Sequence, residues 1–156
     1  EEHAMELDIL IKNARTRLSE DDLLDIGIHD GRMIKIGQIS NAGAVSTIDA
    51  GSRLVTESFV NGHLHLCKVY TLTMAGEDAL GAYTSGTMGA AMEAVEKASR
   101  VKEHYDESWI IENVRKAVNL AIRYGNTHIR AFADTDTKAG LEGVKAVLRA
   151  REEFKE

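Results

Sequence analysis

An apolar run that ends in two histidines constrains the fold of this chain more than any other feature. Residues 59–66 read Phe-Val-Asn-Gly-His-Leu-His-Leu, and Leu54 and Val55 precede them. These apolar residues indicate a buried parallel strand that begins near Leu54 and ends at His63. Because side chains two residues apart lie on the same face of a strand, His63 and His65 should converge on one point, as two ligands of one metal ion must.

The composition narrows the class of protein. The chain has 156 residues, 44% hydrophobic and 28% charged, so it can bury a core. Its net charge is −6 with scattered Lys and Arg, so we expect no nucleic-acid partner. No apolar run approaches the roughly 20 residues that span a membrane, and the acidic start lacks the features of a signal peptide. Cys67 is the only cysteine, which fits a reducing cytoplasm.

The first fifty residues predict β structure. Apolar residues alternate with polar ones over 7–12, 24–28 and 33–36, and a further short strand is expected around 46–48. Asp30-Gly31 lies between two of these runs, which is a strong hairpin signal. His29 beside it is interpreted as a solvated turn residue. We therefore predict a small antiparallel unit, half exposed and short of partners.

The rest of the chain predicts an α/β pattern. A long glycine-containing loop at about 67–89 is followed by a helix over 90–104 and by a second helix, capped by Asp106 or Ser108, that ends near Gly125. A strand over 127–133 follows, and the residues 134–137 offer N-caps for a last helix. The apolar face of that helix would be formed by Leu141, Val144, Val147 and Leu148. Two strands cannot close a sheet or a barrel.

Two motifs carry a resemblance to a family. The strand ending in Phe-Val-x-x-His-x-His resembles the first barrel strand of the amidohydrolase superfamily of metal-dependent hydrolases, most of all its cytosine deaminase and isopropylammelide hydrolase branch. That branch follows His-x-His with Leu-Asp, where this chain has Leu66-Cys67, Lys68 and a nearby Thr71. Its second strand ends in Arg-Thr-His-x-Asp, where this chain has Arg130-Ala131-Phe132-Ala133-Asp134. Cys67 and Phe132 depart from the pattern, as does Glu57-Ser58-Phe59 in place of Pro-Gly-Phe.

The resemblance implies an α/β fold, the start of a (β/α)8 TIM-type barrel preceded by a small antiparallel β-sandwich segment. The domains would be 1–53, the β segment, and 54–156, the first two β/α units. Such a barrel takes about 250 residues, so this chain resembles an N-terminal portion. We expect its catalytic residues beyond residue 156, no activity of this chain alone, and assembly into a homo-oligomer.

The implied chemistry is hydrolysis of a non-peptide C–N bond in a cyclic nitrogen compound, by water that a Zn or Fe ion activates. His63 and His65 would hold the metal. The substrate-binding candidates, all from the resemblance or from their place at strand ends, are Lys68, Phe132, Asp134 and Cys67.

Each of these residues also has a structural interpretation. A His-x-His pair on a strand is often structural. Cys67 is either a third ligand or a small core residue, and Lys68 is either a substrate contact or a solvated lysine. Asp134 is also a natural helix N-cap, and Arg130 is a candidate for a structural ion pair. The remaining histidines, His3, His104 and His128, are interpreted as surface or packing residues.

Two wider alternatives stay open. The segment from Leu72 to Gly89 is either a mobile lid over the barrel mouth or a surface loop; it lacks the pattern of a phosphate-binding loop. The chain as a whole is either part of a hydrolase or a non-catalytic fragment or interaction module that keeps the opening of the fold without a complete active site.

Overall fold

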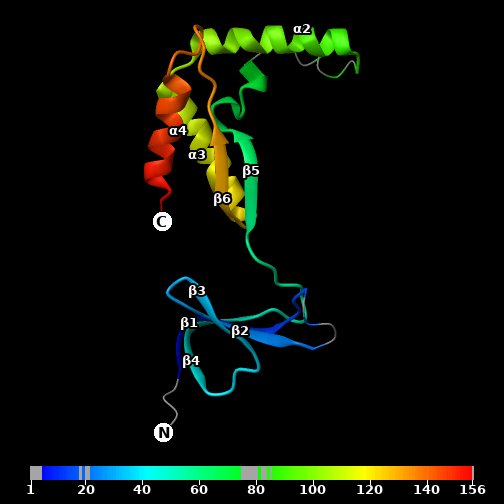
Figure 1. Ribbon diagram of the computed structural model, residues 1–156, viewed down its shortest axis with the longest axis vertical. Coiled ribbons are helices and arrows are strands. Elements are labelled where there is room, and N and C mark those ends of the chain that lie inside the picture. The colour runs from blue at the N-terminus through cyan, green and yellow to red at the C-terminus, as the bar shows by residue number, and fades with distance from the viewer. Residues whose placement is uncertain are drawn as a thin grey trace. The chain divides into compact units, whose positions relative to one another are not determined.

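The computed structural model describes residues 5–17, 19, 22–74, 81, 84 and 86–155. The chain divides into two compact units, Glu1–Glu57 and Ser58–Glu156, which Figure 1 shows in blue to cyan and in green to red. The domain boundary between residues 53 and 54 stays a prediction, and the first compact unit extends to Glu57. The reason is local pairing, because Leu54 forms a parallel bridge with Arg15, and the amide of Val55 donates to the Arg15 carbonyl at 2.7 Å.

The first unit is a four-stranded sheet. Its strands are β1 (Met5–Ala14), β2 (Leu24–His29), β3 (Arg32–Gly37) and β4 (Ala42–Asp49), in the order β3-β2-β1-β4. β2 pairs antiparallel with both β1 and β3, whereas β4 pairs parallel with β1. The predicted antiparallel pairing is confirmed for β1, β2 and β3, and the parallel pairing of β4 departs from it. The segment after β3 carries the chain across to the far edge of the sheet, and Ile39 in that segment is buried with Leu7 and Leu10.

The hairpin predicted at Asp30-Gly31 is confirmed. Both residues have positive φ, 49° and 68°, which fits the tight turn whose twist matches that of the flanking strands. Beyond the turn, β3 remains at the edge of the sheet, and Met33, Ile34 and Ile36 are each about half exposed. β3 is therefore largely exposed, in line with the half-exposed unit that the sequence predicts.

The second unit contains a pair of parallel strands covered by two helices. β5 (Phe59–His65) pairs with β6 (Asn126–Phe132), and α3 (Glu107–Arg123) and α4 (Glu142–Glu153) lie beside them (Figure 1). The other elements are α2 (Met88–Ser99) and the 3-10 helices η1 (Leu66–Lys68), η2 (Leu72–Met74) and η3 (Arg100–His104). The predicted order of strand, loop, helices, strand and helix is confirmed.

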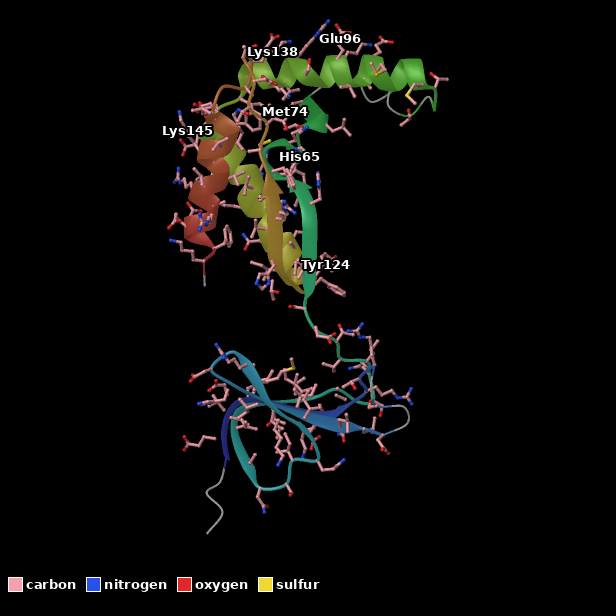
Figure 2. The ribbon with its side chains drawn as sticks, viewed as in Figure 1. His65, Met74, Glu96, Tyr124, Lys138 and Lys145 are labelled. Atoms are coloured by element: carbon pink, nitrogen blue, oxygen red, sulfur yellow. The ribbon has the colours of Figure 1, made fainter. Side chains whose placement is uncertain are left out.

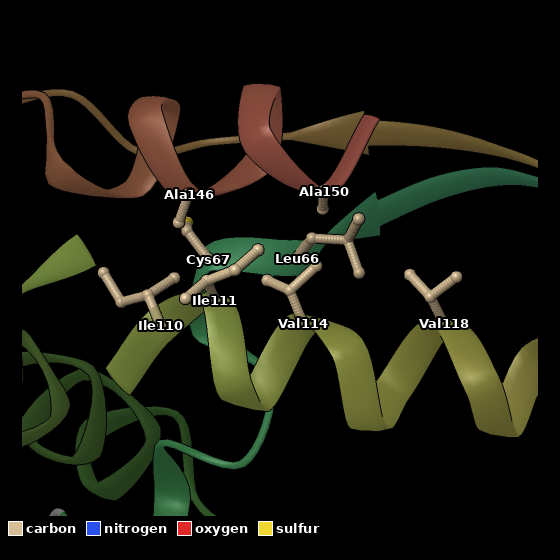
Figure 3. Packing of buried hydrophobic residues seen from close by; sticks show 8 residues of the cluster. All are labelled: Leu66, Cys67, Ile110, Ile111, Val114, Val118, Ala146 and Ala150. Atoms are coloured by element: carbon tan, nitrogen blue, oxygen red, sulfur yellow. The ribbon is translucent and has the colours of Figure 1, made fainter. Parts of the chain in front are cut away.

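The core of this unit lies between α3 and α4. Figure 3 shows η1 wedged between the two helices, with Leu66 and Cys67 pointing at them. The buried residues of the cluster are Leu66, Cys67, Ile110, Ile111, Val114, Val118, Ala146 and Ala150. α3 begins where the sequence predicts, because the Asp106 side chain caps it by accepting from the amide of Ser108 at 2.8 Å.

Several apolar residues that we predicted to be buried are exposed. Phe59 and Val60 on β5 are 61% and 67% exposed, and Leu148 on α4 is about half exposed. α4 instead buries Gly143, Ala146 and Ala150, whose small size lets the helix approach η1 closely. Phe59 and Val60 belong to a sheet that has two strands in the described part of this unit, so few neighbouring residues cover them.

The start of α4 also differs from the prediction. The helix begins at Glu142, after Leu141, with no side-chain cap. Asp136 instead caps the preceding turn by accepting from the amides of Lys138 and Ala139 at 2.9 and 2.8 Å. Asp134 therefore does not cap a helix, and its carboxylate is free for other contacts.

Two further predictions meet the limits of the described residues. The lid hypothesis for Leu72–Gly89 includes residues 75–80, 82, 83 and 85, which lie outside the described residues. His3 also lies outside the described residues. The lid and the interpretation of His3 therefore stay predictions. Among the helices that the structure describes, none combines the length and the apolar character needed to cross a membrane.

Candidate metal centre

His63 and His65 lie together at the carboxyl end of β5, where Figure 2 marks His65. The centroids of their rings are 5.2 Å apart. Two imidazoles that bind one tetrahedral zinc through nitrogens about 2.0–2.1 Å from the ion have centroids about 5 Å apart, so this spacing fits a shared metal. The pairing register with β6 shifts between Asn61 and Leu64, in the segment that contains His63. The two rings therefore lie side by side, as the sequence predicts, and their role as metal ligands stays a prediction.

Asp134 lies two residues after the end of β6 and joins the groups around His65. Its Oδ1 is 3.2 Å from Nδ1 of His65, and its Oδ2 is 3.0 Å from the ammonium of Lys68 and 2.8 Å from that of Lys102. Lys102 also reaches Oδ2 of Asp136 at 2.8 Å. The carboxylate is only 12% exposed, so these three contacts are its main environment. They bring together the carboxyl ends of both strands.

Hydrogen bonds between the carboxylates and the lysines of this cluster favour the charged form of Asp134, Asp136 and Lys102. Burial disfavours the charged form of Asp134, but hydrogen bonds from Lys102 and Lys68 outweigh it and lower the pKa of that carboxyl. Hydrogen bonds to Asp134 and Asp136 in turn raise the pKa of Lys102. The bond from Lys102 also lowers the pKa of Asp136 to about 2. These shifts favour the ionised carboxylates of Asp134 and Asp136 and the ammonium form of Lys102.

Phe132 forms one wall of the pair of histidines. Its ring stacks on that of His63 with centroids 4.1 Å apart and lies 5.6 Å from that of His65. The guanidinium of Arg130 also lies over the ring of Phe132, with its Cζ 5.5 Å from the ring centroid. An aromatic ring thus replaces a hydrogen-bonding group beside the candidate ligands and makes this wall apolar.

Cys67 packs into the core. It is 1% exposed and follows the strand in η1, so it does not continue the alternation of His63 and His65. Its Sγ accepts from the amide of Asp134 at 3.2 Å, and burial, the largest cause, raises the pKa of the thiol. Gly143 of α4 lies directly against it. Cys67 thereby links η1, the segment after β6 and α4.

Lys102 and Tyr105 are the residues at this site that sequence reasoning missed. Lys102 comes from η3, and Tyr105 packs against the buried cluster and hydrogen-bonds to Cys67. Burial raises the pKa of the Tyr105 hydroxyl. The one available signal was their position in the segment between two helices, since nothing in the local pattern separates Lys102 from a solvated lysine.

The metal-ligating side chains also gather elsewhere. Among the described residues, a group of three or more such atoms within 4.8 Å of one another occurs at Asp8, His29 and Asp30 in the first unit. His29 is 46% exposed and lies 3.6 Å from each carboxylate, as expected for a turn residue on the surface. His63 and His65 are a pair without a third ligand in the part of the chain that the structure describes.

A cavity of about 820 Å³ lies between β6, α3 and α4. Its lining includes Ile122, Ile129, Leu148 and Phe154, together with the basic Arg151 and Lys155. The histidine pair and Asp134 are not part of it. Exposed apolar residues of α3 and α4 therefore line this cavity beside β6.

Comparison with known proteins supports the resemblance that the motifs carry. No family model matches the chain. It is 33% identical over 153 residues to N-isopropylammelide isopropyl amidohydrolase of Pseudomonas sp. (strain ADP), an alignment that covers 97% of this chain and 36% of that protein. Among solved structures, it is similar to 5-methylcytosine deaminase of Klebsiella pneumoniae liganded with 5-fluorocytosine (TM-score 0.72, 26% identity, 92% of this chain and 33% of that one).

A third comparison agrees. N-isopropylammelide isopropylaminohydrolase of Burkholderia multivorans ATCC 17616 matches with a TM-score of 0.67 and 25% identity, over 94% of this chain and 34% of that one. The relatives are hydrolases and a deaminase, and this chain spans about a third of their length. The predicted likeness to the N-terminal portion of this amidohydrolase branch is confirmed.

Proposed function

We propose that this chain is the N-terminal part of a metal-dependent hydrolase that acts on non-peptide C–N bonds, a deaminase or amidohydrolase of cyclic nitrogen compounds. The observation that carries the proposal is the pair His63 and His65, whose ring centroids are 5.2 Å apart at the carboxyl end of a parallel strand. That end of the strands is where α/β barrels hold their active sites. The similarity to two amidohydrolases and a deaminase supports the reaction class.

The roles of the residues follow from their positions. His63 and His65 would hold a Zn or Fe ion, which when bound supplies hydroxide near neutral pH for attack on the carbon of the C–N bond. Phe132 would limit the site with an apolar wall beside His63. Lys68 and Asp134, at the same edge, would contact the substrate or the ligands themselves. Further ligands and the group that protonates the leaving amine would come from later strands.

The fold proposal has its own support. β5 and β6 are parallel and are joined through α3, which is how a (β/α)8 barrel begins. The cavity beside β6 is lined by apolar residues of α3 and α4, as expected if a further parallel strand paired with β6 and were covered by these helices. The first unit would then be part of a β-sandwich domain.

A non-catalytic module that keeps the opening of the fold without a complete active site is the second candidate. The test is release of ammonia or amine from pyrimidines, triazines and cyclic amides by the longest natural form of the protein. We expect turnover of at least one compound, its loss in His63→Ala and His65→Ala, and no turnover by the 156-residue chain alone. A longest form that turns over none of these compounds would contradict the hydrolase proposal in favour of the module.

A further inference from the structure

The Asp134 carboxylate is placed to decide which nitrogen of His65 is available. Nδ1 of His65 faces Oδ1 of Asp134 at 3.2 Å. An ionised carboxylate only accepts hydrogen bonds, so the nitrogen that faces it must carry the proton. In a neutral imidazole the opposite nitrogen, Nε2, then has the lone pair.

The lysines keep the carboxylate in this state and orientation. Lys68 and Lys102 both lie on Oδ2, which leaves Oδ1 for His65. Lys102 is itself held by Asp136, and its side chain is 21% exposed. A carboxylate that is 12% exposed and held at one oxygen by two ammonium groups has little freedom to rotate.

We propose that Asp134 is a positioning residue for His65: its Oδ1 accepts the Nδ1–H of His65, so that Nε2 presents its lone pair to the metal, while Lys68 and Lys102 fix the other oxygen. This inference rests on the proposed function, in which His65 is a metal ligand. A carboxylate behind a ligating histidine sets the tautomer and makes the ring a better ligand. Asp134 thus supports the metal without binding it.

The ring tautomer tests the inference without any metal. Long-range ¹⁵N–¹H correlation spectra of the 156-residue chain at pH about 8.5 distinguish the two tautomers of a neutral imidazole. We expect His65 in the Nδ1–H form, and a shift towards Nε2–H in Asp134→Ala. Asp136→Ala is the matched control, because Asp136 shares Lys102 but does not contact His65. An Nε2–H tautomer in the wild-type chain would overturn the inference even if Asp134→Ala does not fold.

Metal affinity gives a second readout that separates this inference from the proposed function. In the longest natural form, Asp134→Ala should weaken Zn²⁺ binding about 10- to 100-fold, as loss of such a supporting contact does elsewhere. Asp136→Ala should leave the Kd unchanged. If His63→Ala abolishes Zn²⁺ binding but Asp134→Ala does not change the Kd, the inference fails and the proposed function stands. If Zn²⁺ binding is indifferent to His63→Ala, the proposed function fails, and the tautomer still decides the inference.

Discussion

Gly143 allows α4 to lie directly on η1, and its replacement by alanine should disturb both the core and the candidate site. A Cβ at this position would lie 2.8 Å from Cβ of Cys67 and 3.7 Å from the carbonyl oxygen of Asp134. Ordinary contact begins at 3.4 Å, and the neighbour is a Cβ attached directly to the backbone, so α4 or η1 must move.

The cost can be worked from these distances. Inserting a methyl group into a packed core costs about 1–3 kcal/mol, and the gain of helix propensity from glycine to alanine, at most about 1 kcal/mol, is smaller at the second residue of a helix. We expect a net loss of about 1–2 kcal/mol for Gly143→Ala. For a unit of about 100 residues this lowers the Tm by about 5–10 °C.

The assay is urea unfolding followed by the fluorescence of Trp109, the only tryptophan, which packs against the core of the second unit. Gly89→Ala is the matched control, because Gly89 is likewise the second residue of a helix but has open space around it. The cost of Gly143→Ala should shrink in a Cys67→Gly background, which removes the contacted atom. Equal unfolding midpoints for Gly143→Ala and Gly89→Ala would refute the reasoning.

Three further predictions concern the same unit. Pairing with Lys102 lowers the pKa of Asp136 to about 2 and also lowers that of Asp134, so the stability from these pairs is complete above about pH 4 and is lost as the pH falls towards 2. The urea midpoint of Lys102→Met should therefore fall less steeply over this pH range than that of the wild-type chain. Equal slopes would contradict the ion pairs. Ile110→Ala, at a fully buried position, should cost about 2–5 kcal/mol in the Trp109 assay, and a loss below about 1 kcal/mol would argue against the packing of α3. The Cys67 thiol, buried and with a raised pKa, should react with a disulfide reagent only as fast as the unit unfolds, whereas rapid reaction of the native chain would show that the thiol is accessible.

The sequence predicts those features of the fold that depend on local patterns. Asp30-Gly31 specifies its hairpin because few residue pairs adopt two positive φ angles. The spacing of His63 and His65 places them together because alternation along a strand is a property of the backbone. Asp106 caps α3 as a side chain of its type does.

The features that the sequence does not predict depend on partners that are distant along the chain. The parallel pairing of β4 with β1 depends on where the crossover goes, and no local signal encodes that. The exposure of Phe59 and Val60 reflects the number of strands that cover them. Lys102 joins the site through a contact with Asp134 that is 32 residues away in the sequence, and Asp134 reads as a helix cap until the true start of α4 is known.

The central claim is that His63 and His65 bind one metal ion. Elemental analysis of the longest natural form of the protein, purified without added metal or chelator, tests it most directly. The account predicts Zn or Fe in a fixed ratio to protein, lost in both His63→Ala and His65→Ala and retained in His29→Ala, since His29 belongs to the exposed group in the first unit. A metal-free protein, or a metal content that both site variants retain, would contradict it.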